Sequence, residues 1–146
     1  MKKFLVTALL AATVAVSAFA TDVNIINSVA VNNFEAAFKH ASNVSWTANK
    51  DYVKATFVLN NIRMEALYST EGDMIGTTKG ITLEELPVNA KRAFAKKYEG
   101  YTVKEAIRFE GNEEGAYFIS AENEKESVIL KVNDNSSVST MKYSKK

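Results

Sequence analysis

Residues 51–59 alternate between two faces, and this pattern limits the fold more than any other feature of the sequence. One face has only apolar residues, Val53, Ala55, Phe57 and Leu59, and the other is mixed, with Tyr52, Lys54, Thr56 and Val58. A period of two is typical of a β-strand with one buried face. Asn60 and Asn61 follow, and they fit a two-residue hairpin turn because asparagine tolerates the positive φ that such turns need. The sequence therefore predicts a β-hairpin whose second strand runs through residues 62–68.

The register of this hairpin follows from its side chains. One face pairs only apolar residues: Leu59 with Ile62, Phe57 with Met64, Ala55 with Ala66 and Val53 with Tyr68. The other face pairs Val58 with Arg63, Thr56 with Glu65 and Lys54 with Leu67, a mixture typical of a face in water. A slip of one residue would mix the two faces, so we expect this register and no other.

A helix and a short strand are predicted before the hairpin. Asn32 or Asn33 can cap the helix, and Asn43 ends it. Its apolar residues follow the i, i+3, i+4, i+7 spacing of one helical face: Phe34, Ala37, Phe38 and Ala41. Residues 44–49 then form a strand. Residues 71–73 turn the chain after the hairpin, and residues 74–79 form the next strand.

The second half of the chain repeats this order. Residues 82–85 have the spacing of a capping box, Pro87 suits a first helical turn, and Gly100 can close the helix. The apolar stripe of this helix is Leu86, Ala90, Ala93 and Phe94, and Lys96 and Lys97 suit its C-terminal end. Strands are predicted at residues 101–109, 116–121, 127–132 and 138–143. In the first of them Val103, Glu105, Ile107 and Phe109 share one face.

The two halves match as an internal repeat, residues 29–80 and 81–146. Ala37-Phe38 corresponds to Ala93-Phe94, and Leu67, Gly72 and Ile75 correspond to Leu130, Asn135 and Val138. Gly72 and Asn135 both tolerate the left-handed backbone of a tight turn. We expect an α+β fold made of two tandem repeats of one helix plus about four antiparallel strands, with both helices on one face of the sheet.

Composition excludes several classes of function. The chain has 146 residues, no cysteine and a net charge of +1. Near-neutral charge gives no electrostatic reason to expect a nucleic-acid partner. The lack of cysteine excludes disulfides, thiolate metal sites, cysteine nucleophiles and a lipid-bearing cysteine.

The N-terminus has the three parts of an export signal. Lys2 and Lys3 precede an apolar stretch over residues 4–16, and Ala18-Phe19-Ala20 fits the signal peptidase site. The stretch is shorter than the ~20 residues of a membrane-spanning helix. We expect cleavage after Ala20, which leaves residues 21–146 as one domain in the periplasm or secreted, without membrane insertion.

The residues give little support for catalysis, a cofactor or a metal. His40 is the one histidine, but no positioned nucleophile accompanies it, so we expect it to be solvated or to cap the helix. Asn133, Asp134 and Asn135 lack the glycine and glutamate of a calcium loop and fit a tight turn. Glu110, Glu113 and Glu114 fit a solvated loop, with weak calcium attraction as a minor alternative.

The face of the sheet opposite the helices is the candidate recognition surface. Tyr52 and Phe118 lie on strands in the phase opposite to Val53 and Ile119. Together with nearby charged residues they predict an amphipathic partner-binding surface on the uncovered face. The candidate residues are Tyr52, Lys54, Arg63, Glu65, Arg108, Phe118 and Lys131.

Several motifs occur in one order along the chain: Phe38-x-x-Ala41-x-x-Val44-x-Trp46, the strand of residues 52–59, Tyr68-x-x-Glu71-Gly72-Asp73, and Leu86-Pro87. The sequence thus resembles the exported PepSY-like, β-lactamase-inhibitor-like proteins of Bacteroidetes. That family often has Phe-Pro where this chain has Phe38-Lys39. The resemblance implies an α+β fold and a non-catalytic envelope protein. Related PepSY domains restrain peptidases, and the inhibitor of similar fold grips an enzyme with its open sheet face, but fold likeness alone transfers neither activity.

Three functions stay open at this point. The favoured hypothesis is an exported module that binds or inhibits a peptide or protein, such as an envelope peptidase, through the open sheet face. A first alternative is a structural protein of the envelope that assembles through its sheet edges. A second is a hydrolase that uses carboxylates such as Glu65 and Glu105, although nothing in the sequence brings these two together.

Overall fold

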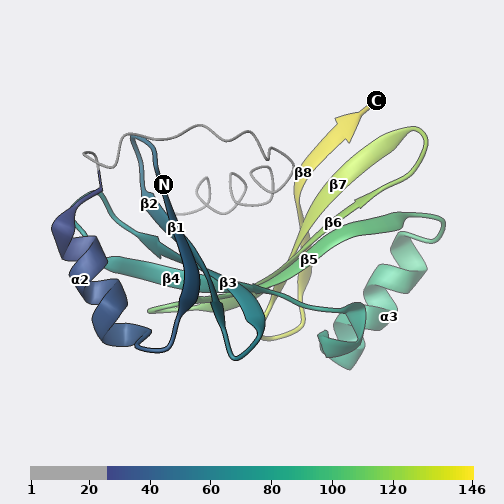
Figure 1. The fold of residues 1–146 in the computed structure, drawn as a ribbon. Helices are drawn as coiled ribbons and strands as arrows, with labels where there is room; N and C mark the ends of the chain where they lie inside the picture. The colour runs from purple at the N-terminus through teal and green to yellow at the C-terminus, as the bar shows by residue number, and fades with distance from the viewer. Residues whose placement is uncertain (1–25) are drawn as a thin grey trace. The chain divides into compact units, whose positions relative to one another are not determined.

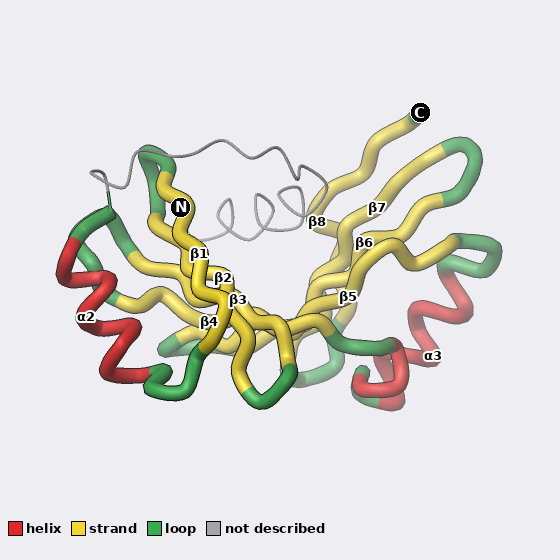
Figure 2. Tube along the Cα trace, in the orientation of Figure 1, coloured by secondary structure: helices red, strands yellow, loops and turns green. Residues whose placement is uncertain are grey.

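The computed structural model describes residues 26–146, which form two compact units. The first unit contains residues 26–79 and 110–113, and the second contains residues 80–109 and 114–146. Each unit has a helix followed by strands (Figures 1 and 2). The export signal of residues 1–20 lies outside the described residues. Within residues 26–146 no helix is both long and apolar enough to cross a membrane.

The first unit has one α-helix and four strands. Its elements are α2 (Ser28–Ala37), β1 (Ser42–Ala48), β2 (Val53–Leu59), β3 (Ile62–Tyr68) and β4 (Met74–Gly80). The strands lie in the order β1-β2-β3-β4, and all three neighbouring pairs are antiparallel.

The predicted hairpin is confirmed residue by residue. Strands β2 and β3 pair Leu59 with Ile62 and Val53 with Tyr68, and the pairs between them follow the expected register. Asn60 and Asn61 have φ of 52° and 63°, the left-handed conformation that a two-residue turn of this type requires. One face of the hairpin is therefore apolar, and it supplies the core of the unit.

Helix α2 covers that apolar face. The buried core consists of Ala30, Phe34, Val53, Ala55, Phe57, Ala66 and Tyr68. Phe34 makes edge contacts with Phe57, at 5.0 Å between ring centroids, and with Trp46, at 5.3 Å. Edge-to-face contacts of this kind stabilise the fold beyond what burial of the apolar side chains contributes.

The predicted start of this helix is wrong. Helix α2 begins at Ser28, where the Asn27 side chain accepts a hydrogen bond from the backbone of Val29 at 2.8 Å. The Asn27 amide also donates to the carbonyl of Thr70, 43 residues away, so tertiary contact selects this cap. The helix ends at Ala37, which is exposed, and Phe38 is its C-cap. The buried residues of the helix are thus Ala30 and Phe34. The expected stripe was Phe34, Ala37, Phe38 and Ala41.

The second unit also has one α-helix and four strands. Its elements are the 3₁₀ turn η3 (Leu83–Glu85), α3 (Val88–Lys97), β5 (Thr102–Gly111), β6 (Gly115–Glu122), β7 (Glu126–Asn133) and β8 (Val138–Lys145). Strands β6, β7 and β8 form antiparallel pairs. Leu86, Ala90 and Phe94 pack against one face of this sheet. The strands and helices of both units agree with the expected α+β class, whereas an internal repeat stays a prediction.

The start of the second helix differs in detail from the expectation. The capping box is present, because Glu85 accepts from the backbone of Thr82 at 2.8 Å, but it caps only η3. Leu86 is extended, as residues before a proline tend to be, and α3 begins after Pro87. Ala93, expected in the apolar stripe, is exposed.

Two further expectations in the second unit are wrong. In β5 the core includes both Val103 and Ala106, so the inward phase changes along the strand and Glu105 does not share a face with the core. In the turn after β7 the left-handed residue is Ser136, with φ of 67°, instead of Asn135. The Asn135 side chain accepts from the backbone of Ser137 at 3.0 Å and stabilises the turn from the neighbouring position.

Candidate functional site

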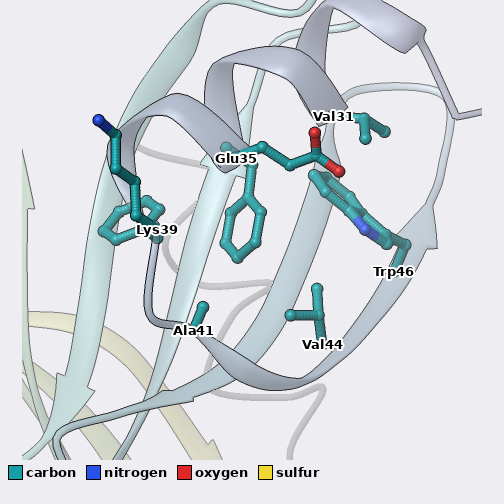
Figure 3. A pocket seen from close by; sticks show the side chains of 8 residues that line it. Val31, Glu35, Lys39, Ala41, Val44 and Trp46 are labelled. Atoms are coloured by element: carbon teal, nitrogen blue, oxygen red, sulfur yellow. The ribbon is translucent and has the colours of Figure 1, made fainter.

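A pocket of about 330 Å³ opens between helix α2 and strand β1 of the first unit (Figure 3). It is lined by Val31, Phe34, Glu35, Phe38, Lys39, Ala41, Val44 and Trp46. Six of these eight side chains are apolar, and the two charged ones come from the helix and the residues just after it. Such a composition, apolar with a few polar groups, is typical of sites that bind ligands.

The aromatic side chains of the pocket are held in place by the core beneath them. Phe34 contacts Trp46, and Phe38 contacts Phe57 at 4.7 Å between ring centroids. Phe34 is buried, whereas Phe38 and Trp46 are half-buried. The pocket therefore has a fixed aromatic lining that remains accessible at the surface.

Strand β1 forms one wall of the pocket and is the edge of its sheet in the described chain. It carries no charged side chain, whereas the edge strand β8 of the second unit carries Lys142 and Lys145. Charged residues and bulges protect exposed edges from pairing with other chains. Strand β1 has only a bulge at its start, between Ser42 and Ser45, where Asn43 has φ of 53°.

The hydrogen-bond pattern leaves the backbone of Trp46 directed away from the sheet. Asn49 donates its backbone N–H to the carbonyl of Tyr52 at 3.0 Å, so these two residues form a hydrogen-bonded pair. Such pairs alternate along an antiparallel ladder. Trp46, which faces Ala55, is therefore in a non-bonded pair, and its N–H and C=O point outward from the edge.

The pocket lining includes two charged side chains, Glu35 and Lys39. The Glu35 carboxylate extends toward Trp46, whereas the Lys39 ammonium points away from Ala41 and Val44 (Figure 3). Both side chains are exposed, and neither makes an ion pair with any residue between 26 and 146. The site thus offers an apolar centre, a strand edge without a neighbouring strand among residues 26–146, and the Glu35 carboxylate.

The residues predicted for the open sheet face are placed differently from one another. In the first unit Arg63 is exposed, but Tyr52 and Lys54 are buried. Lys54 forms an ion pair with Glu65 at 3.0 Å, and the Thr78 hydroxyl donates to the other oxygen of that carboxylate at 3.4 Å. The expectation of a fully water-exposed face is therefore wrong at Tyr52 and Lys54. Both are buried, and the charge of Lys54 is paired with Glu65 on the neighbouring strand.

The predicted residues of the second unit are also engaged. Phe118 is buried. The Arg108 guanidinium lies over the ring of Tyr117 at 4.6 Å and donates to Asp134 at 2.6 Å. Tyr117 packs against the core on the α3 side, so Arg108 does not share the face of Phe118 as expected. Lys131 is 3.6 Å from Glu114. A partner-binding role for these residues stays a prediction.

Two carboxylates of the second unit are perturbed by their cationic neighbours. The hydrogen bond from Arg108 lowers the pKa of Asp134, and hydrogen bonds from Lys104 and Lys146 lower the pKa of Glu122. Glu122 lies in a shallow depression of about 650 Å³ beside these lysines. Its charge is already balanced by 2.9 and 3.1 Å contacts, so this depression is a structural ion cluster.

Sequence reasoning did not find the pocket. Phe34 and Phe38 were placed in the core and Trp46 in the middle of a strand, which is where they lie. What was missed is that α2 ends before Ala41 and leaves these side chains open on one side. The uncharged sequence of β1 was the available signal.

The residues that the sequence offers for acid–base chemistry and metal binding lie in turns at the surface. His40 is exposed in the turn after α2. Residues 26–146 contain no group of three or more metal-ligating side chains. Asn133 and Ser137 close the tight turn after β7, where the backbone N–H of Asn133 donates to the Ser137 carbonyl at 3.0 Å.

The fold is shared with solved structures from Bacteroides. The chain superposes on a periplasmic protein of Bacteroides eggerthii with a TM-score of 0.72 and 14% identity, covering 82% of this chain and 88% of that one. A BLIP-like protein of Bacteroides fragilis gives 0.67 and 14%, with 82% and 85% covered. A DUF2874 family protein of Bacteroides ovatus gives 0.69 and 16%, with 80% and 85% covered. No family model and no curated protein matches the sequence.

These similarities establish the fold and nothing further. At 14–16% identity, side chains of a site are not carried over from one protein to another. The fold is shared with a BLIP-like protein, in agreement with the expected β-lactamase-inhibitor-like fold. Any function has to be argued from the residues of this chain.

Proposed function

We propose that this chain is an exported, non-catalytic module that binds a peptide or protein segment in the pocket between α2 and β1. The observation that carries the proposal is the aromatic lining of this pocket, accessible beside an uncharged strand edge. Such a lining supplies apolar contact area, and β1, an edge strand among residues 26–146, supplies backbone hydrogen bonds. The processed form comprises residues 21–146, and an envelope peptidase is one candidate partner.

Two further observations support an exported binding role. The N-terminal sequence has the features of an export signal, and similar folds occur in a protein described as periplasmic. Val44, at the rim of the pocket, is 40% exposed, and its position beside Trp46 makes it available to a partner. These observations are what a binding module in the periplasm or outside the cell requires.

Other sites remain as alternatives. The open sheet face retains Arg63 as an exposed group, and assembly through sheet edges would use β1 without a foreign ligand. The alternatives predict different effects for substitutions at Arg63 and Val44. Arg63→Ala would disturb face recognition only, whereas a charge at Val44 would disturb both the pocket and assembly through β1. Assembly is told apart because it makes the oligomeric state of the purified protein depend on its concentration.

The proposal is tested by capture of proteins from an envelope extract of the host, followed by affinity measurement with each purified partner. We expect Val44→Asp to reduce the affinity at least tenfold, because it places a charge at the apolar rim. The matched control is Val88→Asp, a change of another exposed valine, which lies on α3 outside the pocket. Equal partner affinities for Val44→Asp and Val88→Asp would contradict a binding role of this pocket, and loss with Arg63→Ala alone would assign binding to the sheet face.

A further inference from the structure

We infer that the pocket between α2 and β1 binds a basic side chain of the partner, arginine in preference to lysine. This inference rests on the proposed function, because it names the chemical class of the group that enters the pocket. It follows from three features of the first unit: the position of the Glu35 carboxylate, the aromatic rings of the lining and the place where α2 ends.

Glu35 supplies the acidic group of the pocket lining. Its carboxylate extends toward Trp46 (Figure 3), and it makes no hydrogen bond or ion pair with any residue between 26 and 146. A ligand that fills the pocket takes water away from this carboxylate, and a carboxylate that loses water without gaining a partner is strongly disfavoured. A neutral or acidic ligand would leave it unpaired, whereas a cation pairs with it.

The aromatic rings of the lining favour the same class of ligand. Trp46 and Phe38 are half-buried. The ring centroid of Phe34 lies 5.3 Å from that of Trp46 and 5.2 Å from that of Phe38, so the three rings form one cluster. The face of an aromatic ring attracts a cation within about 6 Å, and tryptophan does so most strongly. A carboxylate that extends toward a tryptophan in such a cluster is therefore complementary to an organic cation.

The other charged side chain of the lining, Lys39, forms no ion pair with Glu35. The two are four positions apart, a spacing that brings opposite charges together on a continuous helix. Helix α2 ends at Ala37, however, and Phe38 has φ of −125° and ψ of 58°, which are not helical angles. Lys39 therefore leaves the helix surface, and its ammonium points away from Val44 (Figure 3). The pocket has to obtain its cation from a partner.

Arginine suits this lining better than lysine. Its planar guanidinium stacks on an aromatic ring and donates two parallel hydrogen bonds to a carboxylate. It is also more weakly hydrated than an ammonium group, so its entry into an apolar pocket costs less. The Val44 side chain lies apart from the Glu35 carboxylate (Figure 3), which leaves the apolar rim for the aliphatic stem of the bound side chain.

Trp46 is the one tryptophan of the chain, so its indole N–H gives a single resonance that reports on the pocket. The probe is acetyl-Thr-Thr-Arg-Thr-Thr-amide, titrated at low salt against the exported protein labelled with nitrogen-15. The control peptides replace arginine by citrulline, its uncharged isostere, by lysine or by glutamate. We expect a saturable shift with the arginine peptide, at least about fivefold weaker binding of the citrulline peptide, and an intermediate affinity of the lysine peptide. The advantage of arginine over citrulline should shrink in 1 M salt.

Glu35→Gln tests the carboxylate and keeps the size of an exposed side chain. It should weaken binding of the arginine peptide at least about fivefold and change binding of the citrulline peptide less than about twofold. Glu99→Gln is the matched control, because it makes the same change of net charge at an exposed position of the second unit. It should change the affinity for either peptide less than about twofold.

Three results would overturn the inference. The first is the absence of a saturable shift with the arginine peptide, or equal affinity for the arginine and citrulline peptides. The second is an equal loss of affinity with Glu35→Gln and Glu99→Gln. The third is stronger binding of the glutamate peptide than of the arginine peptide, which would assign recognition to Lys39.

Failure of the inference can be told apart from failure of the proposed function. If partners captured from the envelope extract lose affinity with Val44→Asp but not with Glu35→Gln, the pocket binds them without a basic side chain, and the inference alone fails. If neither variant changes the affinity for these partners, the proposed function fails as well. An indole shift that follows protein concentration without any peptide would place a second copy in the pocket and overturn the inference.

Discussion

Gly72 lies against the first turn of helix α2, so closely that a Cβ atom on it would stand 2.7 Å from the Cβ of Val29 and 2.8 Å from the backbone nitrogen of Ala30. The Asn33 side chain donates to the carbonyl of Gly72 at 2.9 Å. The φ of Gly72 is +103°, a conformation that residues with a side chain rarely adopt. The turn between β3 and β4 thus fixes α2, and with it the helical wall of the pocket, through direct backbone contact.

Gly72→Ala should lower the free energy of unfolding by about 3 kcal/mol, the combined result of backbone strain and overlap with the helix. Urea unfolding followed by Trp46 emission measures it. Gly100→Ala is the matched control, because Gly100 has φ of +82° but open space around it, and should cost only about 1 kcal/mol. Equal losses for the two variants would show that contact with α2 is unimportant.

Tyr68→Phe should stabilise the protein. Tyr68 is fully buried in the core of the first unit, and its hydroxyl has no hydrogen-bond partner among residues 26–146. An unsatisfied buried hydroxyl costs about 1 kcal/mol or more, and its removal leaves the ring contact with Trp46 in place. We expect a gain of about 1 kcal/mol in urea unfolding at pH 7. A loss of that size would mean that the hydroxyl has a favourable partner.

The same residue should make stability depend on alkaline pH. Burial raises the pKa of Tyr68 from 10.0 to about 12. Between these values the unfolded chain releases the phenolic proton while the folded chain keeps it, so rising pH favours unfolding. Wild type should therefore lose stability relative to Tyr68→Phe from pH 10 to pH 12, and the two should differ by a constant amount below pH 10. A constant difference through pH 12 would contradict the raised pKa.

Local pattern was enough to predict the hairpin of the first unit, whose pairing from Leu59–Ile62 to Val53–Tyr68 is confirmed. A period of two, one apolar face and two asparagines in the turn all specify the same register. The start of α2 could not be obtained in this way. Asn27, Asn32 and Asn33 are equivalent as caps in sequence, and Asn27 is distinguished only by its contact with Thr70 in a distant turn.

The pocket depends on distances that a sequence does not contain. Phe34, Phe38 and Trp46 have the spacing of ordinary core residues, and whether they close over each other depends on where α2 ends. The prediction of a charged open sheet face was wrong at Lys54 for a related reason. Lys54 and Glu65 lie on neighbouring strands in a diagonal relation, and their pairing removes both from the charged surface that alternation alone predicts.

Lys54 and Glu65 should show a coupling larger than that of a surface ion pair. Their side chains are 9% and 14% exposed, and Thr78 holds the second oxygen of the carboxylate. We expect a double-mutant cycle with Lys54→Met and Glu65→Gln to give about 1–2 kcal/mol, because each single change leaves the other group poorly solvated. The control is the exposed pair Lys91–Glu84, for which 0.2–1 kcal/mol is typical of such pairs. Equal couplings would mean that water solvates Lys54 and Glu65 fully.

Asp134→Asn should reduce stability at neutral pH and have no effect in strong acid. The Arg108 hydrogen bond holds the pKa of Asp134 below its ordinary value of 3.8 in the folded chain. A depressed pKa gives stability that is present above the ordinary value and is lost as the pH falls through the folded one. The difference between wild type and variant, measured by urea unfolding, should therefore be constant above about pH 5 and shrink below pH 4. The change Arg108→Lys should also reduce stability at neutral pH, since lysine keeps the charge but loses the planar contact with Tyr117. If Asp134→Asn has the same effect at pH 2 as at pH 7, the role of Asp134 is one of shape, and its charge does not stabilise the turn after β7.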